Sequence, residues 1–234
     1  QEIRLSGCRQ IPVELGDLPC LTEIDICISD RNLFDNISVG LQLPKVTCVR
    51  VECCTLPSSL IPFLNLLPNC LEELCFNEYE GVEAWEVETN AILSALQNYE
   101  LKFCQSLTTL CIEVSGVNDN GFENLLFKVV PRFPNLRNLI LNQCDIDSLR
   151  GAAKKIKELG LVFDTKLTQL NLRWNGIFYK GLIRSSESKS ITTKLKEIDS
   201  RTSSDEKSAA LLFLNTFDTI SNLGGTLFED RYDP

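Results

Sequence analysis

The sequence predicts an α/β fold built from one repeated unit. Two observations lead to this prediction. An apolar ruler, L-x-x-L-x-L-x-x-C/N-x-L, recurs along the chain at intervals of 25 to 36 residues. After the ruler, apolar residues recur three and four positions apart, which is the spacing of a helix. Self-similarity at roughly 20 to 50 residues is typical of solenoids, so we expect a curved solenoid with parallel strands on its concave face and helices on its convex face.

The ruler is most regular at three places, where every apolar position is filled: 46–56 (VTCVRVECCTL), 136–146 (LRNLILNQCDI) and 167–177 (LTQLNLRWNGI). Its starting positions along the chain are Leu21, Val46, Leu71, Leu107, Leu136, Leu167 and, in degenerate form, Leu195. Near the start, Ile3, Leu5 and Cys8 fit the middle of a unit whose first position would precede Gln1. We therefore expect about seven units over 1–183, the first of them truncated, and a degenerate last unit over 184–234.

These motifs resemble the leucine-rich repeat family, and most of all its ribonuclease-inhibitor-like and cysteine-containing classes. The resemblance covers nearly the whole chain. It departs at Tyr79, where Cys or Asn belongs, and in unit 21–45, which has Ser29 and Arg31 at a polar and an apolar position. The resemblance implies a horseshoe fold and a role in protein binding.

Each x-L-x-L-x core alternates with period two and so predicts a short strand with one buried face. The C/N position after it should point inward and bond backbone groups that the turn leaves unpaired. A helix is expected over 118–130, where Asn118 begins it and Pro131 ends it. Another is expected over 147–159, with an acidic first turn at Asp147.

The last fifty residues are expected to differ from the rest. Residues 184–208 are rich in Ser, Thr and charge, and read as a loop or linker around the strand at Leu195. From Ser203 the spacing becomes helical through Leu223. We expect this helix to pack on the final unit, and the alternative is an amphipathic helix that docks on a partner.

Composition excludes several classes of function. A net charge of −9 and a pI near 4.7 disfavour nucleic acid and anionic lipid as partners. With no His, the chain has no Ser-His-Asp or Cys-His pair and no His-zinc site. We expect no enzyme activity, no metal, no cofactor and no small-molecule substrate.

The eleven cysteines follow the ruler and not a disulfide framework. This usage predicts a reducing compartment, the cytoplasm or the nucleus. There is no apolar run of 18 residues and no signal-peptide pattern, so we expect no membrane contact. With no Met and a first unit that is cut, we expect this chain to be part of a larger intracellular protein.

The x positions of the strand cores alternate with the buried leucines and should form three columns on the inner face. Carboxylates gather in the early units and amides in the late ones. We expect a protein partner to bind there through Glu23, Asp25, Arg50, Glu52, Glu73, Glu113, Asn138, Asn142, Asn171, Arg173 and Trp174. A basic segment of the partner would complement the acidic part. Alternatively, these acids form a solvated face that keeps the protein soluble.

Two cysteines, Cys75 and Cys111, fall in the same column of successive units. They are either a close thiol pair for metal or redox chemistry, or small fillers of the repeat.

The sequence leaves several functions open. The leading hypothesis is a non-catalytic protein–protein interaction module or scaffold. Others that the resemblance implies are the substrate-recognition part of a ubiquitin-ligase adaptor, the sensor part of an immune receptor, and a GTPase-activating protein. A further alternative is a structural subunit of a large assembly.

Overall fold

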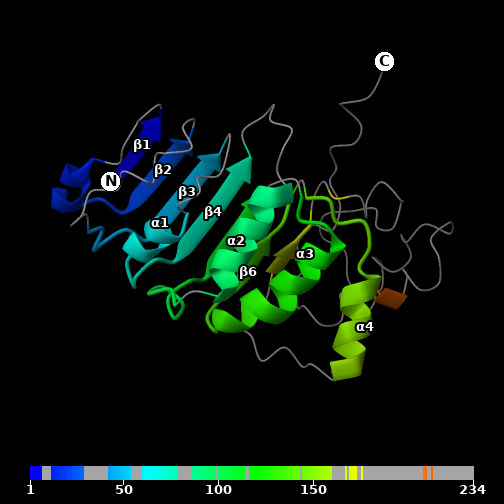
Figure 1. Cartoon of the computed structure of the whole chain (residues 1–234). Coiled ribbons are helices and arrows are strands. Elements are labelled where there is room, and N and C mark those ends of the chain that lie inside the picture. Colours follow the sequence, from blue (N-terminus) through cyan, green and yellow to red (C-terminus); the bar gives the residue numbers. More distant parts are fainter. Residues whose placement is uncertain are drawn as a thin grey trace, which may run out of the picture.

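The fold is seen in a computed structural model of the chain (Figure 1). The residues that the structure describes are 1–6, 12–28, 42–53, 60–78, 86–98, 100–113, 116–142, 144–159, 167, 169–172, 175, 208–209 and 212. Within them, seven strands form a single open parallel sheet in sequence order. The strands are β1 (Glu2–Ser6), β2 (Glu23–Ile28), β3 (Cys48–Cys53), β4 (Glu73–Glu78), β5 (Thr109–Glu113), β6 (Asn138–Ile140) and β7 (Gln169–Asn171).

The strands lie where the ruler places them, and their register is the one that it predicts. Ile24 lies opposite Val49, Leu74 opposite Leu110, and Leu139 opposite Leu170 in the parallel ladder. These apolar residues are at most 2% exposed. Because side chains alternate along a strand, aligning the buried residues in this way also aligns the residues between them on the other face.

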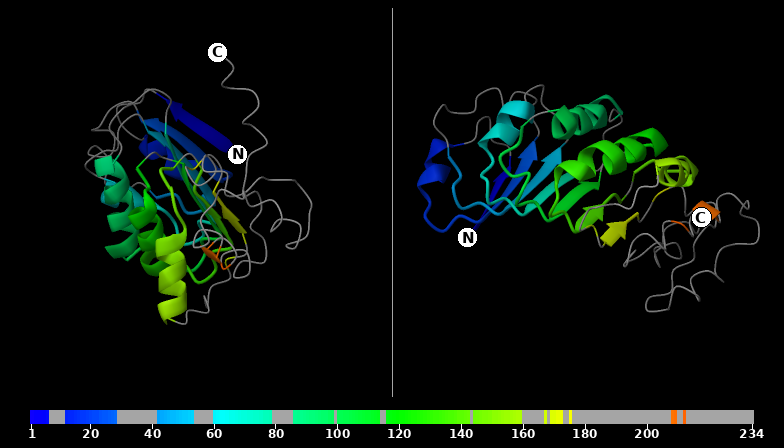
Figure 2. Two further views of the ribbon diagram at one scale, coloured as in Figure 1. Left: turned by 90° about the vertical axis from the view of Figure 1, so that its right-hand side faces the viewer. Right: turned by 90° about the horizontal axis from the view of Figure 1, so that it is seen from below.

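Helices lie on one side of the sheet, as Figures 1 and 2 show. Parallel neighbours require crossover connections, and these helices lie in the crossovers. The α-helices are α1 (Leu60–Leu66), α2 (Glu86–Asn98), α3 (Asp119–Asn124) and α4 (Arg150–Leu159). A 3-10 helix, η1 (Val13–Asp17), lies between β1 and β2. The chain is thus an α/β protein whose core lies between one face of the sheet and its helices.

The helix expected over 118–130 begins as predicted, because the Asn118 side chain accepts a hydrogen bond from the Gly121 amide at 3.1 Å. Its later part differs. After α3 the chain widens into a π-helical turn, η2 (Leu125–Val129), and then tightens into a 3-10 turn, η3 (Val130–Arg132). The Val130 amide donates to the Leu125 carbonyl, and Pro131 has no amide with which to continue the helix.

The helix expected over 147–159 begins later, at Arg150. The prediction of an acidic first turn at Asp147 is wrong. The Asp147 and Ser148 amides donate instead to the Asp119 carboxylate of α3, at 2.7 and 3.0 Å. The Ser148 hydroxyl accepts from the Arg150 amide at 3.1 Å. A neighbouring helix thereby supplies the acceptor that the sequence pattern assigns to Asp147.

The polar position of the ruler is described at two places, and both confirm that its side chain points inward. Asn175 is fully buried, and its amide nitrogen donates to the carbonyls of Leu141 and Leu172 at 2.6 and 3.0 Å. Its amide oxygen accepts from the Ile146 amide at 3.2 Å. Cys144, 3% exposed, donates to the Ile112 carbonyl at 3.3 Å. The remaining polar positions lie outside the described residues, and they include Tyr79, whose turn we expected to be remodelled.

Two features extend the core along the sheet. The Phe103 and Phe133 rings precede β5 and β6 and stack with centroids 6.3 Å apart and planes 9° apart. At the far end, Ala209 is 3% exposed within the core, and Leu212 packs against it. These two residues belong to the expected C-terminal helix, and their contacts agree with packing on the protein's own core. The remainder of that helix and the strand expected at Leu195 lie outside the described residues.

Candidate polar face of the sheet

The face of the sheet opposite the helices carries the three predicted columns, and we refer to it as the polar face. The ladder confirms the columns where it pairs the strands. The first column reads Glu2, Glu23, Cys48, Glu73, Thr109, Asn138 and Gln169, and the second Arg4, Asp25, Arg50, Cys75, Cys111, Ile140 and Asn171. The third column pairs Ser6, Cys27, Glu52, Asn77 and Glu113. Residues distant in sequence thus form one continuous surface.

The guanidinium of Arg50 lies at the centre of the acidic part of this face. Its nitrogens are 3.5 Å from a carboxylate oxygen of Glu23, 3.5 Å from one of Asp25 and 3.3 Å from one of Glu73. These residues belong to β2, β3 and β4, so the ladder itself brings them together. Burial alone would lower the pKa of Arg50, but the carboxylates of Glu73 and Asp25 help to raise it above its ordinary value. Arg50 therefore stays charged and joins three strands.

A second ion pair lies beside this group and joins β1 to β3. Arg4 contacts Glu52 at 2.8 Å, although the Arg4 side chain is 60% exposed. Carboxylates outnumber cations on this part of the face, which holds Arg4 and Arg50 against Glu2, Glu23, Asp25, Glu52, Glu73 and Glu113. Its potential is therefore negative even after the ion pairs have formed.

Amides dominate the later strands, as predicted. The Asn138 side chain donates to the Thr109 hydroxyl at 3.0 Å, and the Asn142 side chain donates to the Glu113 carboxylate. Asn171 is half-buried on β7. Arg173 and Trp174, which the sequence places at the end of this row, lie outside the described residues. The structure thus brings nine of the eleven predicted binding residues together on one face.

Three cysteines on the polar face differ from the expectation of exposed columns. Cys48, Cys75 and Cys111 are only 5 to 7% exposed, because longer side chains flank them, such as Glu73 beside Cys48, Arg50 beside Cys75 and Ile140 beside Cys111. Burial, with a smaller effect of Glu73, raises the pKa of Cys48 to about 12. A hydrogen bond with Cys75, followed by burial, raises the pKa of Cys111 well above its ordinary value. At neutral pH both Cys48 and Cys111 are uncharged thiols.

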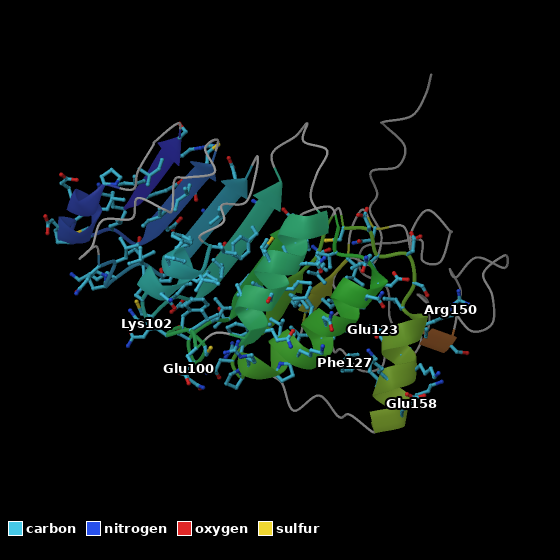
Figure 3. The ribbon with its side chains drawn as sticks, in the orientation of Figure 1. Glu100, Lys102, Glu123, Phe127, Arg150 and Glu158 are labelled. Atoms are coloured by element: carbon cyan, nitrogen blue, oxygen red, sulfur yellow. The ribbon has the colours of Figure 1, made fainter. Side chains whose placement is uncertain are left out.

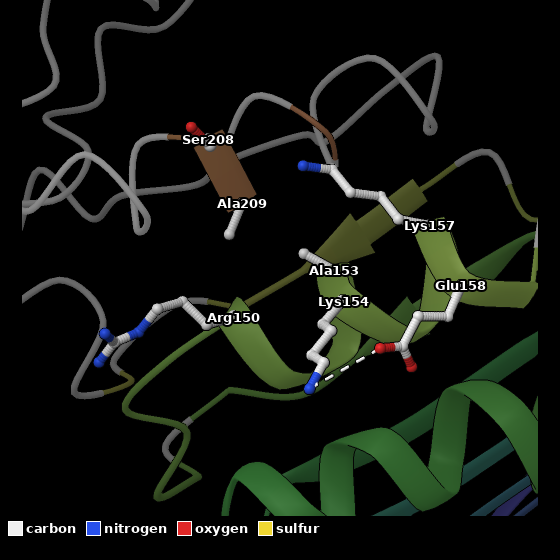
Figure 4. Close-up of a pocket in the computed structure, with 7 residues that line it drawn as sticks. All are labelled: Arg150, Ala153, Lys154, Lys157, Glu158, Ser208 and Ala209. Carbon is white, nitrogen blue, oxygen red and sulfur yellow. Dashed lines mark ion pairs between the residues drawn. The ribbon is translucent and has the colours of Figure 1, made fainter.

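Two surface hollows lie elsewhere, and neither contains a residue of the three columns. One, of about 540 Å³, lies over α4 and is lined by Arg150, Ala153, Lys154, Lys157, Glu158, Ser208 and Ala209 (Figure 4). The other, of about 550 Å³, is lined by Gln42, Leu43, Pro44, Leu66, Pro68, Asn69 and Lys102. The repeat pattern predicts neither hollow, although Lys154 and Lys157, which line the first, stand in the sequence as basic residues of one helix. Lys154 at the first hollow already pairs with Glu158 at 3.7 Å.

The described part of the chain contains no cluster of three or more Cys, Asp or Glu side chains placed to hold a metal ion. Within the same residues, no helix has both the length and the apolar character needed to cross a membrane. The polar face is therefore a broad, negatively charged surface with amide side chains at one end.

Comparison with protein-family models, curated proteins and solved structures finds no match for this chain.

Proposed function

We propose that this chain is a leucine-rich repeat solenoid that acts as a protein-binding module, and that a protein partner with a basic segment binds on its polar face. The fold part of this proposal is supported by backbone contacts that recur where each strand begins. The amide of Thr47 donates to the Thr22 carbonyl at 2.8 Å, and that of Glu72 to the Thr47 carbonyl at 2.8 Å. Thr108 and Arg137 continue the row at 2.9 and 2.8 Å.

The polar position supports the same proposal. Ile112 and Leu141 occupy the same place in successive units of the ruler, and each accepts a hydrogen bond from the inward side chain of the following unit. The donors are Cys144 and Asn175. A thiol in one unit and an amide in the next thereby donate to equivalent backbone carbonyls, which a repeated turn would leave without a partner.

The observation that carries the binding proposal is the excess of carboxylates on one face of the sheet. Glu23, Asp25 and Glu73 share the single guanidinium of Arg50, so their charge is only partly compensated. A partner's Lys or Arg side chains would supply the missing positive charge. Such complementarity mainly raises the association rate and selects among partners. The ionisable groups pair with one another across strands, so we assign this face to binding and not to catalysis.

We also propose an intracellular, reducing location, in the cytoplasm or the nucleus. Eight described cysteines are free thiols, and four of them are buried in the sheet or beside it. Free buried thiols are typical of proteins that remain in reducing compartments.

The test uses neutralised carboxylates on the polar face. Proteins captured from a lysate by the wild-type chain are compared with those captured by the double variant Glu73→Gln/Glu113→Gln and by Glu100→Gln. Glu100 is an exposed carboxylate outside the three columns (Figure 3). We expect a partner that Glu100→Gln retains and the double variant loses. Its dissociation constant, measured with purified protein by calorimetry, should rise about tenfold or more in the double variant.

Salt supplies a second criterion, because complementary surface charges are screened within about 10 Å at 0.1 M ionic strength. Association with the wild type should slow as salt is added, and the double variant should show a weaker salt dependence. A purified partner that binds the double variant as tightly as it binds Glu100→Gln would overturn the proposed role of the polar face.

A further variant, Trp174→Ala, tests the end of the row. We expect it to bind the partner more weakly, with little change in the stability of the chain.

A further inference from the structure

Cys75 and Cys111 have no part in the proposed partner binding. The two residues lie directly opposite each other on the adjacent parallel strands β4 and β5. Their side chains leave the same face of the sheet, since both belong to its second column. Each is almost fully buried, at 6% and 5% exposure. Adjacent strands are separated by about 4.8 Å, and disulfides span Cα separations of about 4.4 to 6.8 Å.

The surroundings of the two thiols are polar and specific. The Cys75 thiol donates to a Glu73 carboxylate oxygen at 3.4 Å, and the Cys111 thiol donates to the Asn77 side-chain oxygen at 3.9 Å. The interaction with Cys75 raises the pKa of the Cys111 thiol, so the two sulfurs lie near each other. The sulfurs are therefore neighbours that acceptors hold on one face, unlike isolated fillers of an apolar core.

We propose that Cys75 and Cys111 are a redox-sensitive dithiol that a hydroperoxide converts into a disulfide between β4 and β5. The Cys75 thiol passes its proton to the Glu73 carboxylate and attacks the hydroperoxide. Its sulfur becomes a sulfenic acid, and the O–O bond breaks to release an alcohol, or water when the oxidant is hydrogen peroxide. The second sulfur then displaces the sulfenic oxygen as water and forms the S–S bond. In total, two thiols lose two protons and two electrons, and the hydroperoxide gains them.

The neighbouring thiol, Cys48, provides a matched control. It lies on the same face and is equally buried, but its partner in the ladder is Glu73 and not a cysteine. Pairing with Cys75 would require Cys48 to reach diagonally across the ladder, to a residue two positions beyond its own partner Glu73. We therefore expect Cys48 to keep its thiol under conditions that oxidise the pair.

The test is to expose the folded full chain to hydrogen peroxide, count its remaining thiols and map the cross-link. Cleavage after Glu isolates Cys75 as the only cysteine of the peptide 74–78. Cys111 lies in the peptide 101–113, which also contains Cys104, so the experiment is done in a Cys104→Ser background. We expect a peptide pair 2 Da lighter than the sum of its thiol forms, the loss of two thiols, and full recovery with dithiothreitol.

Variants separate this outcome from general oxidation. Cys75→Ser and Cys111→Ser should each prevent the cross-link, whereas Cys48→Ser should leave it unchanged. The dithiol reagent phenylarsine oxide should also bind the reduced chain in one-to-one ratio and should lose that binding in either single variant. The proposal is overturned if peroxide leaves both thiols intact while the urea-unfolded chain is oxidised. Cross-linking of Cys75 to another cysteine, or irreversible oxidation of one sulfur alone, would also overturn it.

Discussion

At the scale of single residues, the buried side chains Cys144 and Asn175, which follow β6 and β7, form hydrogen bonds with backbone groups. Asn175 uses both ends of its amide for this, since three backbone groups of neighbouring turns bond to it. Cys144 performs part of the same task with a weaker donor. Asparagine therefore forms the stronger hydrogen bonds at this position, whereas cysteine has the smaller side chain.

Asn175→Ala should destabilise the protein by about 3 kcal/mol or more, because each buried backbone group left without a partner costs about 1–3 kcal/mol. Urea denaturation followed by circular dichroism measures this change. Gln169→Ala, on the exposed side of β7, should change stability by no more than about 0.5 kcal/mol. Equal losses in the two variants would show that the hydrogen bonds of Asn175 contribute nothing.

Alkaline pH tests the environment of Cys48. Its pKa is raised from the ordinary value of 9.0 to about 12 in the folded chain, mainly by burial. Between these values the folded state binds more protons than the unfolded state, so the free energy of unfolding falls as pH rises. Below pH 9 the thiol is protonated in both states and has no effect.

Cys48→Ala should therefore reduce the loss of stability between about pH 8 and about pH 10.5. Urea denaturation at the two pH values measures it. Cys20→Ala, at an exposed thiol, serves as the control and should retain the full loss. An identical pH dependence in wild type and Cys48→Ala would contradict the prediction.

At the scale of elements, close approaches between helices and neighbouring segments fix how the helices pack. Lys155 of α4 pairs with Glu123 of α3 and lies 5.6 Å from the centre of the Phe127 ring. Figure 3 labels Glu123 and Phe127 beside α4. At the other end of the sheet, Gly16 of η1 approaches the Gln42 backbone so closely that a Cβ would lie 2.6 Å from its carbonyl oxygen. Helix placement thus depends on small residues as well as on apolar ones.

Gly16→Ala should destabilise the chain by about 1–3 kcal/mol, because the clash is with backbone that must move. Gly121→Ala is the matched control, since a Cβ there would have no neighbour nearer than 3.4 Å. Gly121 lies within α3, and alanine there should be neutral or stabilising by up to about 1 kcal/mol. Thermal denaturation measures the melting temperature of both variants. Shifts of the same sign and size in Gly16→Ala and Gly121→Ala would contradict the prediction.

At the scale of the whole molecule, the two faces of the sheet have different roles in stability. The helix side buries apolar residues of every described strand, whereas the polar face joins strands by ion pairs centred on Arg50. These pairs are partly exposed, so their main effect is to offset repulsion among neighbouring carboxylates.

Arg50→Gln should therefore lower the free energy of unfolding by about 1 kcal/mol at low ionic strength. The difference should shrink at about 1 M salt, where the screening length is about 3 Å. Lys102→Gln, at an exposed lysine outside the polar face, should show little change at either salt concentration. Urea denaturation at both concentrations measures the effect, and a loss that does not depend on salt would point to packing instead.

Much of this fold and of its polar face follows from spacing alone. The apolar ruler predicts every described strand, and its alternation predicts which residues share a column. Because nine of the eleven predicted binding residues lie on those strands or directly after them, the ladder brings them to one face. Arg173 and Trp174 remain predictions, and so does the identity of the partner.

Other features could not be predicted because they depend on contacts between units. Whether Cys75 and Cys111 are exposed depends on the size and direction of side chains on neighbouring strands. The start of α4 depends on a carboxylate of α3, and the grouping of three acids around Arg50 depends on the twist and spacing of three strands. The sequence by itself determined the described strands, their register and the column of each residue in the ladder, because these follow from the local alternation of apolar and polar residues. Only the tertiary structure decided burial, helix boundaries and ion pairing, because these are set by which side chains meet across the sheet.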